Sequence, residues 1–174
     1  MKNILVIIFT NLTLSAFTQT SVNISFTVSS IALLDIAPNN TAFNLNLIAP
    51  TEAGNIIDVT TVNSTKWINF TSAVVTGITR RVTAQLSGTV PAGLNLKLVV
   101  SNYAGTGAGA LGISSGTLSL SSVAQTVINN IAGAYTGDGA NNGYNLNYSL
   151  QILDYSLLKS QTATFSIIYT MSDN

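Results

Sequence analysis

The stretch that most resembles a functional site lies at residues 135–150 and reads YTGDGANNGYNLNYSL. It places one carboxylate, Asp138, among glycines and two adjacent asparagines. A calcium-binding loop that began at Asp138 would need an oxygen ligand at its third position and a bidentate glutamate at its twelfth. The chain has Ala140 and Ser149 there. Because glycine, aspartate and asparagine tolerate positive φ angles, we predict a hairpin turn that leads into a strand from Tyr144, and no metal ligands.

Two other patterns of known sites overlap in the glycine-rich stretch at residues 102–116. Gly107–Gly112 has the glycine spacing of a dinucleotide-binding turn, which works only where a strand feeds a helix, and no helical pattern follows directly. Gly112–Gly116 has the spacing of a nucleophile elbow around Ser114. A serine nucleophile needs a base, and the chain contains no histidine to complete the usual triad. We therefore predict a long irregular loop, no catalytic residue and no cofactor.

The composition argues against several classes of function. Of 174 residues, 7% are charged and 47% are hydrophobic, and the formal net charge is zero. A surface without excess positive charge gives no footprint for nucleic acid, and near-zero net charge favours association between copies. Without cysteine the chain has no disulfides or thiolate chemistry. We expect the remaining acidic residues to be solvated, at strand ends or in loops: Asp35, Glu52, Asp58, Asp154 and Asp173.

The first 18 residues have the order of a secretory signal peptide, with Lys2, an apolar run from Ile4 and then small residues. Cleavage is expected after Thr18, or after Thr20 as an equal alternative. Polar residues interrupt the apolar run well before the roughly 20 residues that a membrane helix needs. We expect residues 19–174 to form one secreted domain, outside the cell or on its surface, with no membrane span in the mature chain.

After this segment the hydrophobic residues recur with a period of two, which is typical of strands with one buried face. Clusters of glycine, proline, asparagine and aspartate separate the strands. Many short strands with turns between them predict an all-β fold, a single antiparallel β-sandwich of immunoglobulin or pilin type. The alternating segments lie at residues 22–28, 43–47, 82–86, 94–98, 144–152 and 163–171.

One segment fits two kinds of secondary structure. In residues 121–133, Val123, Val127 and Ile131 recur at a helical spacing, and Ser122 begins a capping-box pattern. The same residues fit a strand with one irregularity. A short helix near 122–132 and an irregular strand therefore both stay open.

The only tryptophan, Trp67, gives an alternative function. Its indole could form a stacking platform for a sugar ring, although a lone tryptophan among alternating apolar residues more often belongs to a core. On this alternative the protein is a secreted carbohydrate-binding, lectin-like module that holds a glycan through Trp67 or the glycine-rich loop.

The two ends of the mature chain resemble the secreted fimbrial subunits that chaperone–usher systems assemble. The similarity lies in NISFTVSSIALLDI at residues 23–36 and in TATFSIIYTMSDN at the C-terminus. In such subunits the N-terminal segment is donated as a strand to a neighbouring subunit, and the terminal strand pairs with a chaperone. The resemblance implies a non-enzymatic structural or adhesive subunit. Its implied partners are copies of itself, related surface subunits and a periplasmic chaperone.

The candidate donor strand is residues 21–29, which would self-associate by strand addition. Its polar face carries no charge that would guard an edge against pairing. Whether it pairs within its own domain or with a neighbour stays open. The apolar face consists of Val22, Ile24, Phe26 and Val28, and the resemblance makes Phe165, Ile167 and Tyr169 the candidates for pairing at the terminal strand.

Overall fold

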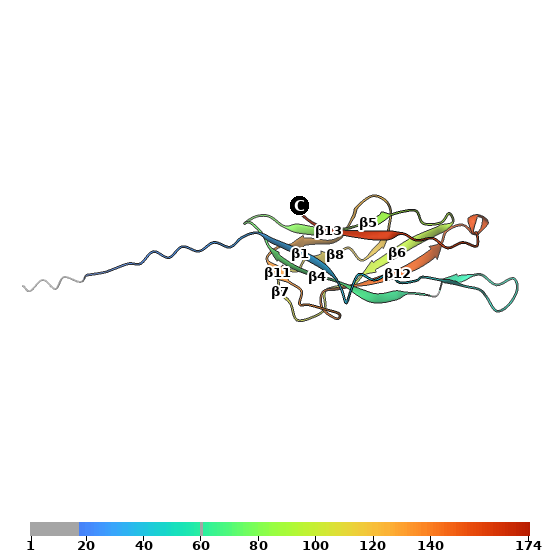
Figure 1. Ribbon diagram of the computed structural model, residues 1–174, viewed down its shortest axis with the longest axis horizontal. Helices are drawn as coiled ribbons and strands as arrows, with labels where there is room; N and C mark the ends of the chain where they lie inside the picture. Colours follow the sequence, from blue (N-terminus) through green and yellow to red (C-terminus); the bar gives the residue numbers. More distant parts are fainter. Residues whose placement is uncertain (1–17, 60) are drawn as a thin grey trace, which may run out of the picture.

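The protein folds into two packed antiparallel sheets, from which a long N-terminal segment extends (Figure 1). The structure is a computed structural model that describes residues 18–59 and 61–174. Apart from Thr18, the expected signal peptide at residues 1–18 lies outside the described residues. Strands account for 46% of the chain and helix for 2%, which confirms the predicted all-β sandwich.

The larger sheet has the strand order β7–β11–β4–β12–β6–β9, and β1 pairs with the opposite side of β4. All its pairings are antiparallel, and β1, β7 and β9, which each have one partner strand, lie at its edges. The strands are β1 (Ile31–Ala37), β4 (Asn63–Ala73), β6 (Leu94–Val100), β7 (Ala108–Gly109), β9 (Thr117–Ser119), β11 (Ala134–Tyr135) and β12 (Tyr144–Ile152).

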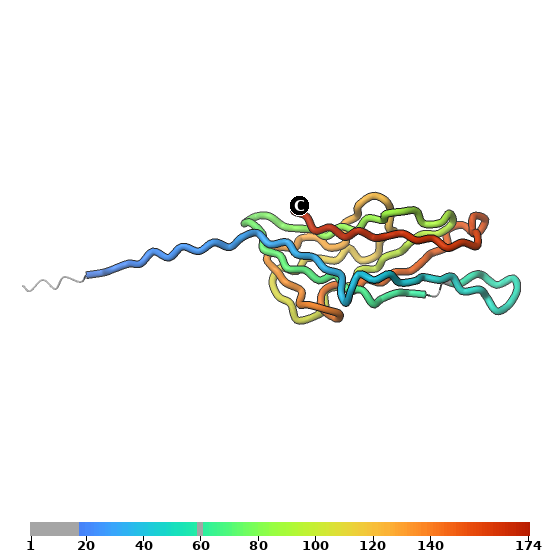
Figure 2. The backbone as a smooth tube through the Cα atoms, in the orientation of Figure 1, coloured from blue at the N-terminus to red at the C-terminus, as the bar shows by residue number. Residues whose placement is uncertain are grey.

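The smaller sheet has the order β13–β5–β10–β8. Its strands are β5 (Arg80–Ser87), β8 (Ile113–Ser114), β10 (Gln125–Ile131) and β13 (Ser166–Asp173). A separate two-stranded ribbon of β2 (Leu47–Ile48) and β3 (Asp58–Val59) extends from one end of the sandwich (Figures 1 and 2). A single 3₁₀ turn, η1 (Tyr155–Leu157), precedes the last strand.

The core lies between the two sheets because each long strand turns alternate residues inward. In β5, Val82, Ala84 and Leu86 are buried, whereas Arg81 and Gln85 are exposed. The inward side chains of β4, β6, β10 and β12 meet them. The fully or almost fully buried hydrophobic residues of this core are Ile68, Phe70, Val82, Ala84, Leu86, Leu96, Leu98, Val100, Leu120, Val127, Ile128, Ile131, Tyr144, Leu146 and Tyr148.

The ambiguous segment at 122–132 is a strand, so the helix alternative is wrong. Strand β10 pairs with β5 on one side and β8 on the other, and its register against β5 shifts twice. Asn130 adopts a φ of 59° at this irregularity. Because the shifts let the adjacent residues Val127 and Ile128 both point into the core, the apolar spacing departs from two and imitates a helix.

The predicted hairpin turn at residues 135–144 is also wrong. Strands β11 and β12 do not pair with each other; both pair antiparallel with the same side of β4, at Ser72–Thr71 and at Ile68–Asn63 respectively. They are two pieces of one strand line. Thr136 still hydrogen-bonds to Phe70 of β4, and residues 137–142 leave the strand line before it resumes. The turn residues therefore form a loop within a strand line, although the strand from Tyr144 begins where it was predicted.

Candidate self-association surface

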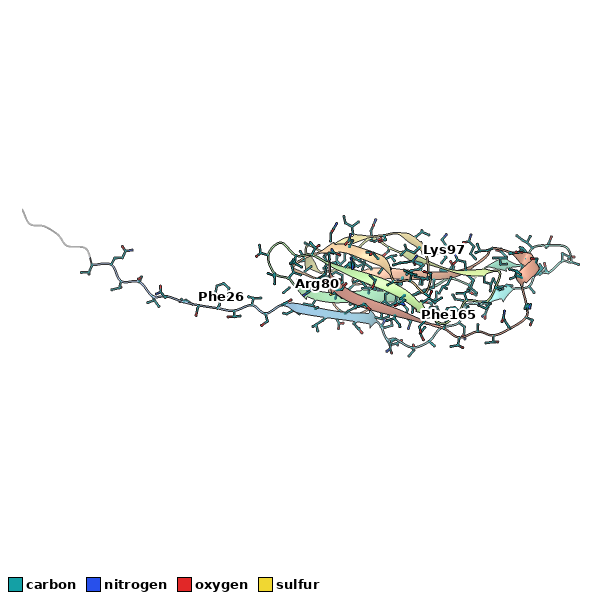
Figure 3. All side chains as sticks on the ribbon, turned by 90° about the horizontal axis from the view of Figure 1, so that it is seen from above. Phe26, Arg80, Lys97 and Phe165 are labelled. Carbon is teal, nitrogen blue, oxygen red and sulfur yellow. The ribbon has the colours of Figure 1, made fainter. Side chains whose placement is uncertain are left out.

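The N-terminal arm, residues 18–30, is an extended segment that leaves the sandwich at the start of β1 (Figure 2). It forms no strand pairing with the rest of the described chain. Its four apolar side chains are almost fully exposed: Val22 86%, Ile24 86%, Phe26 87% and Val28 73%. Figure 3 shows Phe26 far outside the packed sheets. Monomeric proteins seldom leave such an alternating apolar row in water, so the arm is a candidate interaction element.

An unpaired side of the sandwich lies next to the arm. Within the described residues, β13 pairs with β5 alone and β1 pairs with β4 alone. These two strands belong to different sheets but lie side by side (Figures 1 and 3). We call their free sides together the open edge. Each free side presents backbone N–H and C=O groups that another strand can pair with.

Burial falls towards the open edge. The inward residues of β5 and β4 are almost completely buried, but those of their neighbours β13 and β1 are covered only in part. Part of the inner apolar surface there thus remains in contact with water. The partly buried residues along this side are Leu34 and Ile36 of β1, Phe43 and Leu45 of the following segment, and Phe165, Ile167, Tyr169 and Met171 in and before β13.

The structure therefore places the predicted site residues in two groups. Val22, Ile24, Phe26 and Val28 lie on the arm and do not contact the sandwich as a strand. Ile167 and Tyr169 lie on the inner side of β13, and Phe165, directly before β13, packs against the same core. The two groups are not in contact within one copy, but their types are complementary, since both are uncharged apolar rows on extended backbone.

A pair of tyrosines fixes β13 against the larger sheet. The hydroxyl oxygens of Tyr148 in β12 and Tyr169 in β13 lie 2.6 Å apart and share a hydrogen bond. Burial raises the pKa of both phenols above the ordinary value of 10. The ring of Phe43 packs on Tyr148 with centroids 4.9 Å apart. The terminal strand is thus held at its middle although its outer side is unpaired.

Two charged side chains near this surface were not singled out as site residues by the sequence. Lys66 of β4 is buried, and its Nζ donates to the carbonyl oxygen of Asn39 at 2.9 Å and to Asn39 Oδ1 at 3.0 Å. It thereby holds the segment that carries Phe43. Arg80, the first residue of β5, is 5% exposed and forms an ion pair with Asp173. The sequence does contain a signal for a buried arginine. Arg80 and Arg81 are consecutive residues of a strand, and one of two consecutive strand residues must point inward.

Trp67 lies on the outer face of the larger sheet, where it is half-buried. It pairs across the strands with Ala37 on one side and Asn145 on the other. It is therefore neither part of the core between the sheets nor a fully exposed platform.

The glycine-rich loop is more ordered than predicted, because it contributes the short strands β7 and β8. A Cβ atom on Gly107 would lie 2.0 Å from the carbonyl oxygen of Tyr135, so this glycine packs against backbone. Ser114 Oγ donates to the carbonyl oxygen of Val100 at 2.8 Å and accepts from the N–H of Gly116 at 3.1 Å. The dinucleotide-like and nucleophile-elbow-like glycine patterns therefore serve local packing. The hydroxyl of Ser114 donates its hydrogen bond to a carbonyl oxygen and not to a base.

Asp138 has a carboxylate neighbour that the sequence did not reveal. Asp138 and Asp35 line one open pocket of about 400 Å³ on the outer face of the larger sheet, together with Asn69 and Tyr135. Asn69 is 5% exposed; its Nδ2 donates to the carbonyl oxygen of Asn142 at 2.6 Å, and its Oδ1 is buried without a hydrogen-bond partner. Asp35 pairs with Asn69 across β1 and β4, and Asn69 binds Asn142 in the loop that also carries Asp138. These contacts bring the segments of Asp35 and Asp138 to the same pocket.

Residues 18–59 and 61–174 contain neither a candidate metal site nor a candidate membrane helix. No three acidic side chains there are grouped closely enough to hold a metal ion. No helix in this part of the chain is long and apolar enough to cross a membrane. Comparison with known proteins gives no family: no family model, no curated protein and no solved structure matches the chain.

Proposed function

We propose that the protein is a secreted, non-enzymatic structural or adhesive subunit of a fimbria-like filament, and that copies associate by strand addition. The arm of one copy adds to the open edge of the next. The observation that carries this proposal is the presence, in one chain, of an unpaired arm with four exposed apolar side chains and a sandwich with two adjacent unpaired strands. The signal-like N-terminus and the resemblance to fimbrial subunits support secretion.

The dimensions of the two elements are compatible. The donor segment 21–29 is extended, and β13 has 8 residues, so the segment is long enough to pair along the whole strand. Strand addition pairs backbone groups that are already ordered on the acceptor, and it removes the apolar row of the arm from water. Fully burying one such side chain contributes about 1.5–3 kcal/mol.

Charge does not oppose this association. Neither the donor segment nor residues 166–172 of β13 contain a charged residue. Natural edge strands that must stay unpaired usually carry a lysine, a proline or an inward charge. The absence of these residues from both sequences supports a role in pairing, and the same edge would serve a strand donated by a periplasmic chaperone or by a related subunit.

The test compares two full-length variants that add the same charge one residue apart. Phe26→Asp puts a carboxylate on the apolar face of the arm, whereas Thr27→Asp puts it on the polar face. Both proteins are purified from the secreted fraction, and assembly is followed by sedimentation and negative-stain microscopy beside wild type.

We expect filaments or large oligomers from wild type and from Thr27→Asp, and monomers from Phe26→Asp. Circular dichroism shows whether the sandwich is intact in each protein. If all three proteins stay monomeric under every condition, or if Phe26→Asp assembles as wild type does, strand addition by the arm is wrong.

One observation favours a second candidate function, the carbohydrate-binding module. The outer pocket combines a half-exposed aromatic ring, Tyr135, with the carboxylates of Asp35 and Asp138, and such a combination suits sugar hydroxyls and a sugar face. This pocket is a better candidate than the half-buried Trp67. Sugar-dependent retention of a monomer on glycan columns, lost in Tyr135→Ala, would favour this function over the structural one.

A further inference from the structure

One buried guanidinium group holds the point where the arm joins the sandwich. Arg80 Nη2 donates to Ser30 Oγ at 2.7 Å, and Nη1 donates to the carbonyl oxygen of Ile31. Nη1 also donates to Ser72 Oγ at 3.2 Å and to the carbonyl oxygen of Ala73 at 3.3 Å. These contacts tie the last residue of the arm and the first residue of β1 to the end of β4.

The same side chain also reaches the terminal strand. Arg80 Nε donates to Asp173 Oδ1 at 2.8 Å, at the C-terminal end of β13. Arg80, labelled in Figure 3, thus joins the root of the arm to the end of the terminal strand. Its guanidinium group suits this role, because it donates from three nitrogen atoms, whereas a lysine ammonium donates from one.

The direction of the arm follows from these contacts. Because Ser30 and Ile31 are held in line with β1, the arm continues straight away from the sandwich (Figures 1 and 2). The open edge of the same copy runs in the opposite direction, along β1 and β13. To reach it, the arm would have to reverse its course just before Ser30.

The residues available for such a reversal are poorly suited to it. Tight two-residue turns between antiparallel strands need positive φ angles, which glycine, asparagine and aspartate accept. Next to Ser30 the chain has Thr27, Val28 and Ser29, and two of these are β-branched. Release of Ser30 and Ile31 from Arg80 would add freely rotating residues to the turn and make the reversal easier.

We infer that Arg80 is a positioning residue that keeps the arm away from its own open edge, so that the arm is available to a second copy of the chain. This inference rests on the proposed function and adds to it the reason why a subunit does not close on itself. A subunit that closed on itself would fill its own edge and would neither accept nor donate a strand.

The test uses the complete mature chain and a matched pair of variants, Arg80→Lys and Arg81→Lys. Both keep the net charge and lie next to each other in β5, but Arg81 is exposed. The chain has no cysteine, so Asn23→Cys, on the polar face of the arm, and Ser166→Cys, at an exposed position of β13, introduce a unique pair of spin labels. The label-to-label distance is measured in labelled protein diluted with unlabelled protein, and assembly is followed by sedimentation.

For wild type and Arg81→Lys we expect a long label distance and normal assembly. For Arg80→Lys we expect a short label distance and assembly slowed about tenfold or more. This is the change that follows from losing one or two of the hydrogen bonds that hold the arm. If Arg80→Lys does not fold, Ser30→Ala, which leaves the Arg80–Asp173 pair intact, should show the same change to a smaller extent.

The inference is overturned if the folded variant assembles as wild type does, or if it stays monomeric while the arm remains far from Ser166. The proposed function itself is overturned by a separate result. If wild type does not assemble and does not bind an added peptide of residues 21–30, strand donation fails whatever the label distances are.

Discussion

The hydroxyl groups of Tyr148 and Tyr169 lie 2.6 Å apart and connect the two sheets beside the open edge. Tyr148 is 2% exposed and belongs to the larger sheet, whereas Tyr169 belongs to β13, which has one unpaired side. Because β13 pairs only with β5 in the described chain, this contact helps to keep it in place although its other side is unpaired. The terminal strand is therefore fixed by a buried polar pair as well as by apolar contacts.

The tyrosine pair should make the protein sensitive to alkali. Burial raises the pKa of both phenols above 10, so above pH 10 the unfolded chain loses protons that the folded protein keeps. Their contribution to stability is therefore complete below pH 10 and is lost as the pH rises through the folded pKa values. In urea unfolding at a series of pH values, the double variant Tyr148→Phe/Tyr169→Phe should lose stability less steeply above pH 10 than wild type. Above pH 10 the free energy of unfolding should fall by about 1–2 kcal/mol less in the double variant than in wild type.

Tyr135→Phe is the control for this prediction, since Tyr135 is half exposed on the outer face. It should follow the wild-type curve. An alkaline loss that is equally steep in the double variant would show that other groups cause it.

The loop that interrupts the β11–β12 strand line should depend on one glycine. Gly143 has a φ of +88°, and a Cβ atom there would lie 2.0 Å from the carbonyl oxygen of Ile68. Gly139, in the same loop, has a φ of +82° but open space around it. In thermal or urea unfolding, Gly139→Ala should cost about 1 kcal/mol, the cost of a positive φ angle for a residue with a side chain. Gly143→Ala should cost at least about 3 kcal/mol, because backbone must also move. Equal costs would show that strand β12 can shift freely at this point.

This loop also shows where sequence patterns stop being informative. The alternation from Tyr144 gave the start of β12 correctly, because alternation depends on which face a residue turns to the core. The turn residues before it predict a hairpin, which the structure does not contain, because the local sequence does not specify the partner with which a strand pairs. Only the long-range pairing with β4 shows that the chain leaves a strand line and returns to it. The shared pocket of Asp35 and Asp138 escaped prediction for the same reason.

The residues of the candidate site, like the elements of the fold, could be predicted from the sequence only in part. The apolar rows of the arm and of the terminal strand are periodic and local, so their residues could be named from the sequence. The role of Arg80 could not be named, because its partners come from Ser30, Ile31, Ser72, Ala73 and Asp173, which only the packed sheets bring together. Asp173 in particular, expected to be solvated, forms an ion pair with a buried arginine while its own side chain stays 62% exposed.

Ser114 should be chemically inert. Its hydroxyl proton is donated to the carbonyl oxygen of Val100, which cannot act as a general base. A fluorophosphonate probe should leave the mature protein unlabelled. Ser114→Ala should reduce the free energy of unfolding by about 1 kcal/mol, as for the loss of ordinary hydrogen bonds. Labelling that disappears in Ser114→Ala would reveal an activating group near this serine.

The two faces of β13, the proposed acceptor strand, should differ in their effect on strand binding. Ile167 points to the inner side of β13, where it is partly buried, and Ile168 points outward and is 50% exposed. Both are isoleucines in the same strand, paired with the neighbouring β5 residues Leu86 and Gln85. If an added strand covers the inner apolar surface of the open edge, a polar residue at position 167 should weaken binding far more than the same residue at 168.

The measurement is the affinity of a fluorescent peptide of residues 21–30 for full-length protein whose own arm carries Phe26→Asp, so that self-association does not compete. Ile167→Thr should bind the peptide about tenfold more weakly than the parent, since it loses about 1–2 kcal/mol of apolar contact. Ile168→Thr should stay within about twofold. Circular dichroism and urea unfolding of each variant show that the sandwich is folded at the temperature of the titration. A peptide that carries Phe26→Asp is the control ligand and should not bind to any of the proteins. Equal affinities for the two threonine variants would show that the apolar row of the peptide does not pack on the inner face of β13, because the side chains of a paired strand alternate between the two faces and only one row of this peptide is apolar.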